Sequence, residues 1–248
     1  GTLSNSEKHL IDLAKSRISE SIKLFKRCPI NSKEILNLKK ILIDIYGIMP
    51  SGLNPESIVA VGSRKQNLIA TATVIAMTGE NWSNSIELAN QIFKNSDKEI
   101  RKLKDSQQSR VLLPGAKEFL EKLFQENIKC ALISNDSKDG ILSFLQENNI
   151  GHLIQCYWSA EDNPCKPDPR AVKNVCKKLG VRPSECALIG DANADLLMAK
   201  RAHVGIKLGY IAGWSIPPKL TNHQYLINHW DDMNVECSPK MHTSLNKK

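Results

Sequence analysis

The sequence predicts an α/β protein in which a parallel sheet domain is joined to an all-helical domain. From about residue 111 onward, short apolar segments alternate with segments of helical periodicity. That order is typical of a parallel sheet covered by helices on both faces. Residues 6–105, in contrast, place apolar side chains at helical spacing almost throughout and show no two-residue alternation. We therefore expect the helical domain to lie ahead of most of the sheet in the chain.

The helical domain reads as a bundle whose segments are separated by ordinary breakers. Gly47 and Pro50 end its second segment, and Pro55 is expected to open the next one. Residues 67–77 are apolar on most sides, which is typical of a helix in the middle of a bundle. Apolar residues recur at helical spacing over residues 10–25, 35–45, 67–77 and 81–100.

The second half begins after a polar linker at residues 105–110. Strands are expected at 111–113, 129–134, 155–158, 186–189 and 204–208, with a weaker strand and helix over 225–233. Helices are expected at 116–125, 138–147 and 169–179, and in a segment that ends at 201. The resulting division is 1–5, 6–105 for the helical domain, 106–235 for the sheet domain, and 236–248 for a polar tail.

Composition bounds the class of protein. The 248-residue chain has a net charge of +8 and a pI near 9.1, and its basic residues are spread without a dense run. This charge favours anionic ligands such as phosphates and gives no sign of a nucleic-acid partner. Seven cysteines without a C-x-x-C pair are typical of a reducing compartment. We therefore expect a cytoplasmic monomer or homodimer with no membrane contact, since its apolar runs are too short to span a bilayer.

The most informative stretch is the apolar run that stops at Gly190 and is followed at once by Asp191. Asp195 lies four residues further on, in the first turn of the next expected helix, so it would point back toward the same strand end. Two carboxylates there suit a hard cation such as Mg²⁺. In the alternative interpretation, Asp195 complements the helix dipole and Asp191 is a loop residue.

Two further strand ends carry polar residues. Ser134 and Asn135 follow an apolar run, and a hydroxyl beside turn amides can hold phosphoryl oxygens. The competing interpretation is a helix N-cap, which we favour for Asp136. Lys166 lies in a proline-stiffened loop ahead of Asp168 and Pro169, which form a strong helix start. Taken alone, a loop lysine is expected to be a surface residue.

Together, the order Ser134…Lys166-Pro…Gly190-Asp191-x-x-x-Asp195 resembles the haloacid dehalogenase superfamily, in its Mg-dependent, phosphoglycolate-phosphatase-like phosphatase branch. The resemblance covers residues 111–233 closely. Ser134 and Asn135 match the second family motif, Lys166 the third, and Asp191 with Asp195 the fourth. It implies a Rossmann-like core with the helical domain as an inserted cap.

The first family motif is an aspartate, any residue, a second aspartate, and then Gly-Thr-Leu at the end of the central strand. Gly1, Thr2 and Leu3 match its last three positions, and both aspartates are absent. We therefore expect residues 1–5 to be the remnant of that motif, and the chain to be an inactive fragment whose central strand and nucleophile lie upstream.

The resemblance implies phosphomonoester hydrolysis through an aspartyl-phosphate, on a small phosphorylated metabolite. Asp191 and Asp195 would hold Mg²⁺, Ser134 and Asn135 would bind the phosphoryl group, and Lys166 would balance charge during catalysis. The alternative is a non-catalytic relative that binds a phosphorylated ligand or a protein partner.

Overall fold

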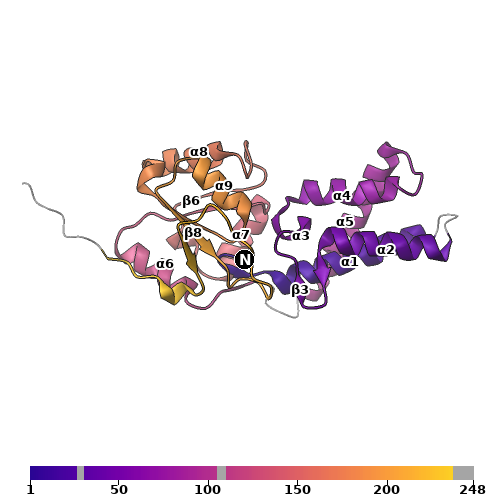
Figure 1. Cartoon of the computed structure of the whole chain (residues 1–248), viewed down its shortest axis with the longest axis horizontal. Coiled ribbons are helices and arrows are strands. Elements are labelled where there is room, and N and C mark those ends of the chain that lie inside the picture. The colour runs from indigo at the N-terminus through magenta and orange to yellow at the C-terminus, as the bar shows by residue number, and fades with distance from the viewer. Residues whose placement is uncertain (27–30, 105–109, 237–248) are drawn as a thin grey trace, which may run out of the picture.

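The computed structural model describes residues 1–26, 31–104 and 110–236. Figure 1 shows two lobes side by side, with the N-terminus between them. Residues of the indigo-to-magenta part of the chain form the cap lobe, and most of the rest forms the core lobe. The linker expected at 105–110 and the polar tail fall almost wholly outside the described residues. Within the described ranges, no helix is long and apolar enough to cross a membrane.

The cap lobe is helical apart from one short hairpin. Its helices end where local sequence signals place them: Asn31 and Ser63 form capping boxes, and Gly47 closes a helix with a φ of 72°. The lobe contains α1 (Glu7–Phe25), α2 (Ser32–Tyr46), β2 (Ile48–Met49), β3 (Gly52–Leu53), α3 (Ile58–Val61), α4 (Arg64–Ala76) and α5 (Trp82–Lys104).

Two details of the cap differ from the sequence expectation. The expected all-helical domain contains the antiparallel pair β2–β3, in which each strand has only two residues. Such a pair is too short to produce an alternating pattern that could be recognised in the sequence. Pro55 does not open a long helix, because a turn and the four-residue α3 precede α4.

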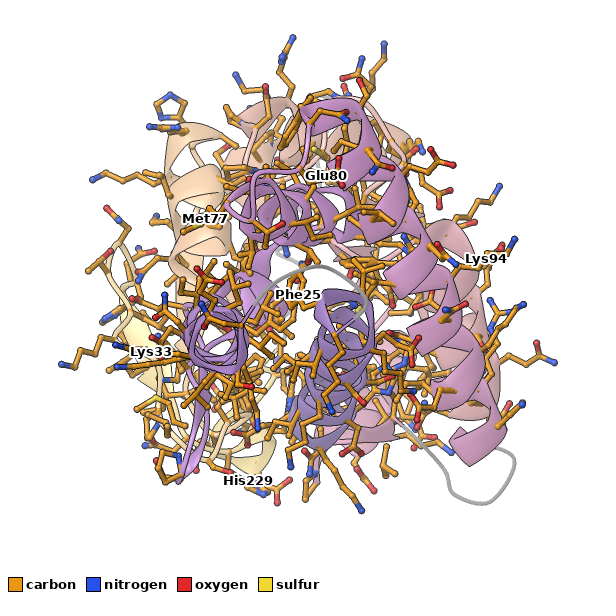
Figure 2. All side chains as sticks on the ribbon, turned by 90° about the vertical axis from the view of Figure 1, so that its right-hand side faces the viewer. Phe25, Lys33, Met77, Glu80, Lys94 and His229 are labelled. Carbon is orange, nitrogen blue, oxygen red and sulfur yellow. The ribbon has the colours of Figure 1, made fainter. Side chains whose placement is uncertain are left out.

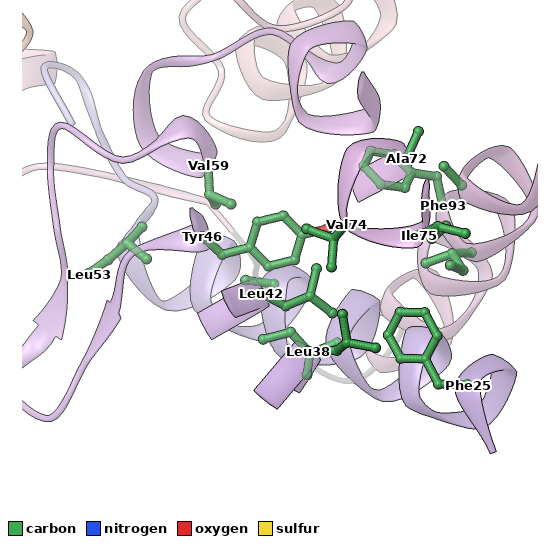
Figure 3. Close-up of a cluster of buried hydrophobic side chains, with 14 of the residues drawn as sticks. Phe25, Leu38, Leu42, Tyr46, Leu53, Val59, Ala72, Val74, Ile75 and Phe93 are labelled. Atoms are coloured by element: carbon green, nitrogen blue, oxygen red, sulfur yellow. The ribbon is translucent and has the colours of Figure 1, made fainter. Parts of the chain in front are cut away.

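The cap has a hydrophobic core of its own. Figure 3 shows Phe25, Leu42, Tyr46 and Phe93 converging from α1, α2 and α5, and each is at most 1% exposed. The Tyr46 hydroxyl lies 2.5 Å from the Thr71 hydroxyl, so its polar end is satisfied inside the core. Since each large apolar side chain contributes about 1.5–3 kcal/mol when buried, this cluster can hold the lobe together.

The lysines of the cap whose burial the structure describes are exposed on its outside, whereas Glu7 and Arg17 are buried. Figure 2 looks onto this lobe and shows Lys33 and Lys94 on opposite sides of it, with Glu80 near the top and Phe25 among the helices. The positive charge of the cap is therefore distributed around the lobe rather than gathered into a stripe.

The core lobe has the expected alternation of strands and helices. It contains β4 (Val111–Leu112), α6 (Ala116–Gln125), β5 (Ala131–Ile133), α7 (Lys138–Glu147), β6 (Cys156–Trp158), α8 (Pro169–Leu179), β7 (Ala187–Gly190), α9 (Asn193–Arg201), β8 (Ile206–Tyr210) and β9 (Tyr225–Ile227). All pairings among β5–β9 are parallel, as predicted. β4 instead pairs antiparallel with β1 (Ser4–Asn5) where the chain passes between the lobes.

The parallel strands form two separate groups with a gap between them. Among the strands that the structure describes, β5 pairs only with β6, and β7 pairs only with β8 in the group β7–β8–β9. The free edges of β5 and β7 both border one cavity of about 1300 Å³. Helix α8 packs against α9, and their apolar cluster includes Ile133 of β5 and Leu188 of β7. The two groups therefore share one helical layer, as parts of a single sheet would.

A buried carboxylate joins the lobes. Glu7, at the start of α1, is 7% exposed and accepts hydrogen bonds from both lobes. One oxygen accepts from the Leu53 amide of the cap hairpin at 2.8 Å, and the other accepts from the amide (2.8 Å) and hydroxyl (2.6 Å) of Ser215. Trp214, beside Ser215, packs into the cap's hydrophobic core.

We predict that Glu7→Gln lowers the free energy of unfolding by about 3 kcal/mol, because the amide can accept from only one side and leaves buried donors unpaired. Urea denaturation measures the change. Lys8→Gln, at the exposed next position of α1, is the matched control and is expected to change stability by less than about 0.5 kcal/mol. Equal effects of the two substitutions would contradict the assignment of Glu7 as the link.

Candidate active site

The end of β7 places two carboxylates together. Asp191 follows directly after the strand, and Asp195 lies in the first turn of α9 with 6% exposure. A Cβ atom added at Gly190 would lie 2.5 Å from the Cβ of Asp195. Glycine is therefore required before Asp191, because it lets the Asp195 side chain pack against the strand end. The functional roles of both residues remain predictions.

Asp191 is surrounded by donors. The Thr2 hydroxyl and the Trp214 indole Nε1–H (2.8 Å) donate to its two oxygens, and the Gly1 ammonium lies 3.3 Å from Oδ2. Burial alone would raise the pKa of this carboxyl. The Gly1 ammonium, the hydrogen bonds from Thr2 and Trp214, and the charge of Lys166 outweigh it and lower the pKa to about 2. Asp191 is therefore an anion at neutral pH.

Lys166 connects the two groups of strands. Its Nζ lies 2.6 Å from Asp195 Oδ1, next to β7, and donates to the Ile133 carbonyl at the end of β5 at 3.3 Å. Both charged side chains are largely buried, with 13% and 9% exposure. The contact with Asp195 is an ion pair without hydrogen-bond alignment, so Oδ1 keeps bonding capacity for another ligand. This observation excludes the surface interpretation of Lys166.

The loop that carries Lys166 is anchored at both ends. The Trp158 indole donates to the Pro164 carbonyl at 2.8 Å before the lysine. After it, the Asp168 side chain accepts from the Arg170 amide at 2.8 Å and caps α8, with Pro169 at the first helical position. The predicted helix start at Asp168 is confirmed. A lysine held between two such anchors loses little freedom when it binds an anion.

Ser134 and Asn135 lie at the end of β5. The Ser134 amide donates to the Trp158 carbonyl of β6 at 2.9 Å, and its hydroxyl oxygen accepts from the Asp136 amide at 3.1 Å. Since a hydroxyl that accepts still has its own proton to donate, Ser134 can bind a phosphoryl oxygen. The Asn135 side-chain N–H donates to the Val61 carbonyl of the cap at 2.7 Å, while its Oδ1 is buried without a partner.

The preference for Asp136 as the N-cap of α7 was wrong. Ser137 caps that helix, because its hydroxyl accepts from the Gly140 amide at 3.1 Å. Asp136 instead pairs with Arg110 at 2.5 Å and accepts from the Ser137 amide. Its carboxylate is thus used to hold the segment that follows the lobe connection.

All the predicted site residues line the same cavity between the lobes: Ser134, Asn135, Lys166, Asp191 and Asp195. The cavity therefore brings together the uncharged polar side chains of Ser134 and Asn135, a fixed ammonium and two carboxylates. Within the described ranges there is no group of three or more His, Cys, Asp or Glu side chains that could hold a metal. The two carboxylates still fit Mg²⁺, because this ion takes oxygen ligands, usually one or two of them from protein carboxylates, and keeps waters.

Comparison with known proteins identifies the family of the chain. A family model described as haloacid dehalogenase-like hydrolase matches residues 58–208, more than half of the chain. The chain belongs to this family. The match begins in the cap at α3 and extends to β8, so it includes Ser134, Lys166, Asp191 and Asp195.

Individual haloacid dehalogenase-like proteins are similar over different lengths. The phosphoglycolate phosphatase of Pseudomonas fluorescens strain Pf-5 is 33% identical over 113 residues, which cover 44% of this chain and 42% of that protein. The chain thus aligns with less than half the length of such curated relatives. A crystal structure described as a predicted phosphoglycolate phosphatase from Haemophilus somnus 129PT has a TM-score of 0.64 at 22% identity, covering 94% and 92% of the two chains. A β-phosphoglucomutase from Clostridium difficile has a TM-score of 0.57 at 21% identity, covering 90% and 87%. These structures support the fold.

Sequence reasoning missed three residues that shape the site. Thr2 belongs to the quoted Gly-Thr-Leu match, so its contact with Asp191 could have been anticipated. Trp214 and Glu7 carry no motif, because their partners lie more than 20 residues away in the sequence. Only the folded chain brings these pairs together.

We predict that Lys166→Met lowers the free energy of unfolding by about 3–5 kcal/mol, because it leaves the Asp195 carboxylate buried without its cation. The double variant Lys166→Met/Asp195→Leu should recover part of that loss. The exposed pair Arg182–Glu185 (2.7 Å) is the matched control, and its removal should cost less than about 1 kcal/mol. Urea unfolding of the wild type and these variants measures the changes in the free energy of unfolding. If the double variant changes the free energy of unfolding by the sum of the changes caused by Lys166→Met and Asp195→Leu alone, Lys166 and Asp195 do not interact.

Proposed function

We propose that the protein is an Mg²⁺-dependent phosphomonoester hydrolase that acts on a small phosphorylated metabolite. The carrying observation is the Lys166–Asp195 contact of 2.6 Å, which brings the carboxylates after β7 next to the strand end that holds Ser134. Family membership and the names of the phosphoglycolate phosphatase relatives support this proposal. A cytoplasmic location and a monomeric or homodimeric state belong to the same proposal.

In this proposal, the residues after β5 hold the transferred group. The Ser134 hydroxyl and the backbone N–H of Asn135 would donate to phosphoryl oxygens, and Lys166 would place one positive charge beside them. Because Lys166 is anchored, this charge would be in place before the substrate arrives. The cap would cover the site and exclude water, since Asn135 already bonds to Val61 of α3.

Asp191 and Asp195 would hold the metal ion. Bound there, Mg²⁺ would neutralise negative charge on the phosphate, which reduces its repulsion of an attacking carboxylate. The hydrogen bonds from Thr2 and Trp214 and the charge of Lys166 act to lower the pKa of Asp191, which favours its ionised, coordinating form. Thr2 and Trp214 would orient the carboxylate by donating to its oxygens.

The nucleophile would come from a strand that fills the gap between β5 and β7. Those two free edges border the cavity, and the Gly1 ammonium lies 3.3 Å from Asp191 at the carboxyl end of the gap. A strand leading into Gly1 would therefore end beside the metal site. An aspartate at its end would attack phosphorus, the ester P–O bond would break, and a second aspartate would protonate the leaving oxygen. Water would then hydrolyse the aspartyl-phosphate.

The strand and the nucleophile can be tested separately. We would compare residues 1–248 with two extended chains that add about ten residues, the length of one strand and its lead-in, ending in Asp-x-Asp or in Asn-x-Asn. Both extensions should raise the melting temperature, because both supply a strand that can form backbone hydrogen bonds and apolar contacts with β5 and β7. Only Asp-x-Asp should hydrolyse p-nitrophenyl phosphate in Mg²⁺. Equal melting of all three chains would refute the strand, and hydrolysis by residues 1–248 or by Asn-x-Asn would refute the nucleophile.

In the Asp-x-Asp chain, Asp191→Asn should raise the Mg²⁺ concentration needed for activity and lower kcat by several orders of magnitude, and Asp195→Asn should be milder. Lys166→Gln should also lower kcat. Lys166→Arg should retain only part of the activity, because the planar guanidinium is bulkier than the ammonium and directs its N–H groups differently. Steady-state kinetics at several Mg²⁺ concentrations check these outcomes. Near-normal turnover of Lys166→Gln would remove the lysine from the mechanism. Phosphate binding without any hydrolysis by the Asp-x-Asp chain would favour a non-catalytic, phosphate-binding role for the site.

A further inference from the structure

Two cysteine side chains of the core lobe lie against each other between α8 and β7. The Sγ atom of Cys176, in the last turn of α8, is 3.8 Å from the Sγ atom of Cys186, which directly precedes β7. Both cysteines are free thiols. Asp191 follows the other end of β7, so the pair lies at the opposite end of this strand from the carboxylates of the candidate active site.

The backbone between the two cysteines fixes their contact. Gly180 ends α8 with a φ of 69°, and the Val181 amide donates back to the Cys176 carbonyl at 3.0 Å. A short 3-10 turn follows, in which the Cys186 amide donates to the Pro183 carbonyl at 3.1 Å. Because these hydrogen bonds reverse the chain within ten positions, the two sulfur atoms meet through local structure alone.

The two thiols differ in their surroundings. Cys176 is 4% exposed and packs in the apolar cluster that α8 shares with α9, which lies beside it (Figure 1), whereas Cys186 is half-buried. Burial raises the pKa of the Cys176 thiol, and the nearby sulfur atoms of Cys186 and Cys156 raise it further. Cys176 is therefore a protonated thiol at neutral pH, and Cys186 offers the sulfur atom that a dissolved reagent can reach.

We propose that Cys176 and Cys186 form a redox-modification site, at which hydrogen peroxide produces a reversible disulfide that joins α8 to β7. The Cys186 sulfur attacks one peroxide oxygen, so that an S–O bond forms, the O–O bond breaks, and the departing oxygen leaves as water with the Cys186 proton. The Cys176 sulfur then attacks the resulting sulfenic acid, so that the S–S bond forms, the S–O bond breaks, and a second water carries away the Cys176 proton. Two thiols are thereby oxidised to one disulfide while one peroxide is reduced to two waters.

The disulfide requires little rearrangement and stabilises the core lobe. The sulfur atoms must approach from 3.8 Å to the ~2.05 Å of an S–S bond, across a turn that is already ordered. The cross-link then restricts the unfolded chain while it keeps a contact that the folded chain already makes. Since α8 follows Lys166 and β7 leads to Asp191, it ties together the two elements next to these residues. The competing explanation is that both cysteines are only small apolar side chains of the core.

Peptide mapping of the 248-residue chain tests the inference after treatment with a small excess of hydrogen peroxide, alkylation of the remaining thiols and digestion by trypsin without reduction. We expect a cross-linked product that joins residues 174–177 to residues 179–200 and is lighter, by two hydrogen masses, than the two thiol peptides together. Dithiothreitol should restore both thiols. Cys156→Ala removes the third thiol of the same apolar cluster and is the matched control, which should form the disulfide as the wild type does.

Thermal unfolding measures the effect of the cross-link. The oxidised wild type should melt about 5–10 °C above the reduced wild type, because the disulfide closes a loop of about ten residues. Cys176→Ala should form no cross-link and gain no stability, and its Cys186 should oxidise further to a sulfinic acid that dithiothreitol does not reverse.

The remaining outcomes would overturn the inference. A cross-link from Cys176 to Cys156, or a sulfinic acid at Cys186 in the wild type with Cys176 still a thiol, would show that this pair does not close. Unreacted Cys176 and Cys186 in a chain whose exposed Cys165 is oxidised would establish the purely apolar role. A disulfide that leaves the melting temperature unchanged or lowers it would refute the stabilisation of α8 against β7.

Discussion

The contact between Lys166 and Asp195 is the constraint on which the site depends. It joins the end of β7 to the loop before α8, and the same ammonium reaches the Ile133 carbonyl at the end of β5. Since β5 and β7 are not hydrogen-bonded to each other, this lysine and the shared helices α8 and α9 fix the positions of the two strand ends relative to each other. A buried ion pair is a poor source of net stability, so its value here is positional.

A few polar contacts hold the cap against the core lobe. Glu7 binds the cap hairpin and Ser215 at once, and Asn135 reaches from the end of β5 to Val61. Trp214 packs in the cap core while its indole donates to Asp191. Each contact ties a cap element to the core lobe, and those of Asn135 and Trp214 reach the ends of β5 and β7. The position of the cap, the charge on Asp191 and the positions of these strand ends are therefore coupled by short, buried interactions.

The sequence predicted the features that depend on neighbouring residues. The parallel strands, the Asp168 cap and the return of Asp195 to the end of β7 all follow from local spacing and from the strand–helix order. The N-cap of α7 was missed because Asp136, Ser137 and Ser134 are all suitable capping residues within one turn, and tertiary pairing with Arg110 decides among them. Glu7 and Trp214 were beyond prediction, because their partners come from distant segments. The gap between β5 and β7 was expected from family resemblance and not from any residue pattern.

The central claim is that one site at these strand ends binds a phosphoryl group through Ser134 and Lys166, and it can be observed directly. A crystal of the 248-residue chain soaked with tungstate, a heavy tetrahedral phosphate analogue, would locate the site by anomalous scattering. Our account predicts one main peak within hydrogen-bond distance of both the Ser134 hydroxyl and the Lys166 ammonium, and its loss in Lys166→Gln. A dominant peak elsewhere, or an unchanged peak in Lys166→Gln, would contradict it.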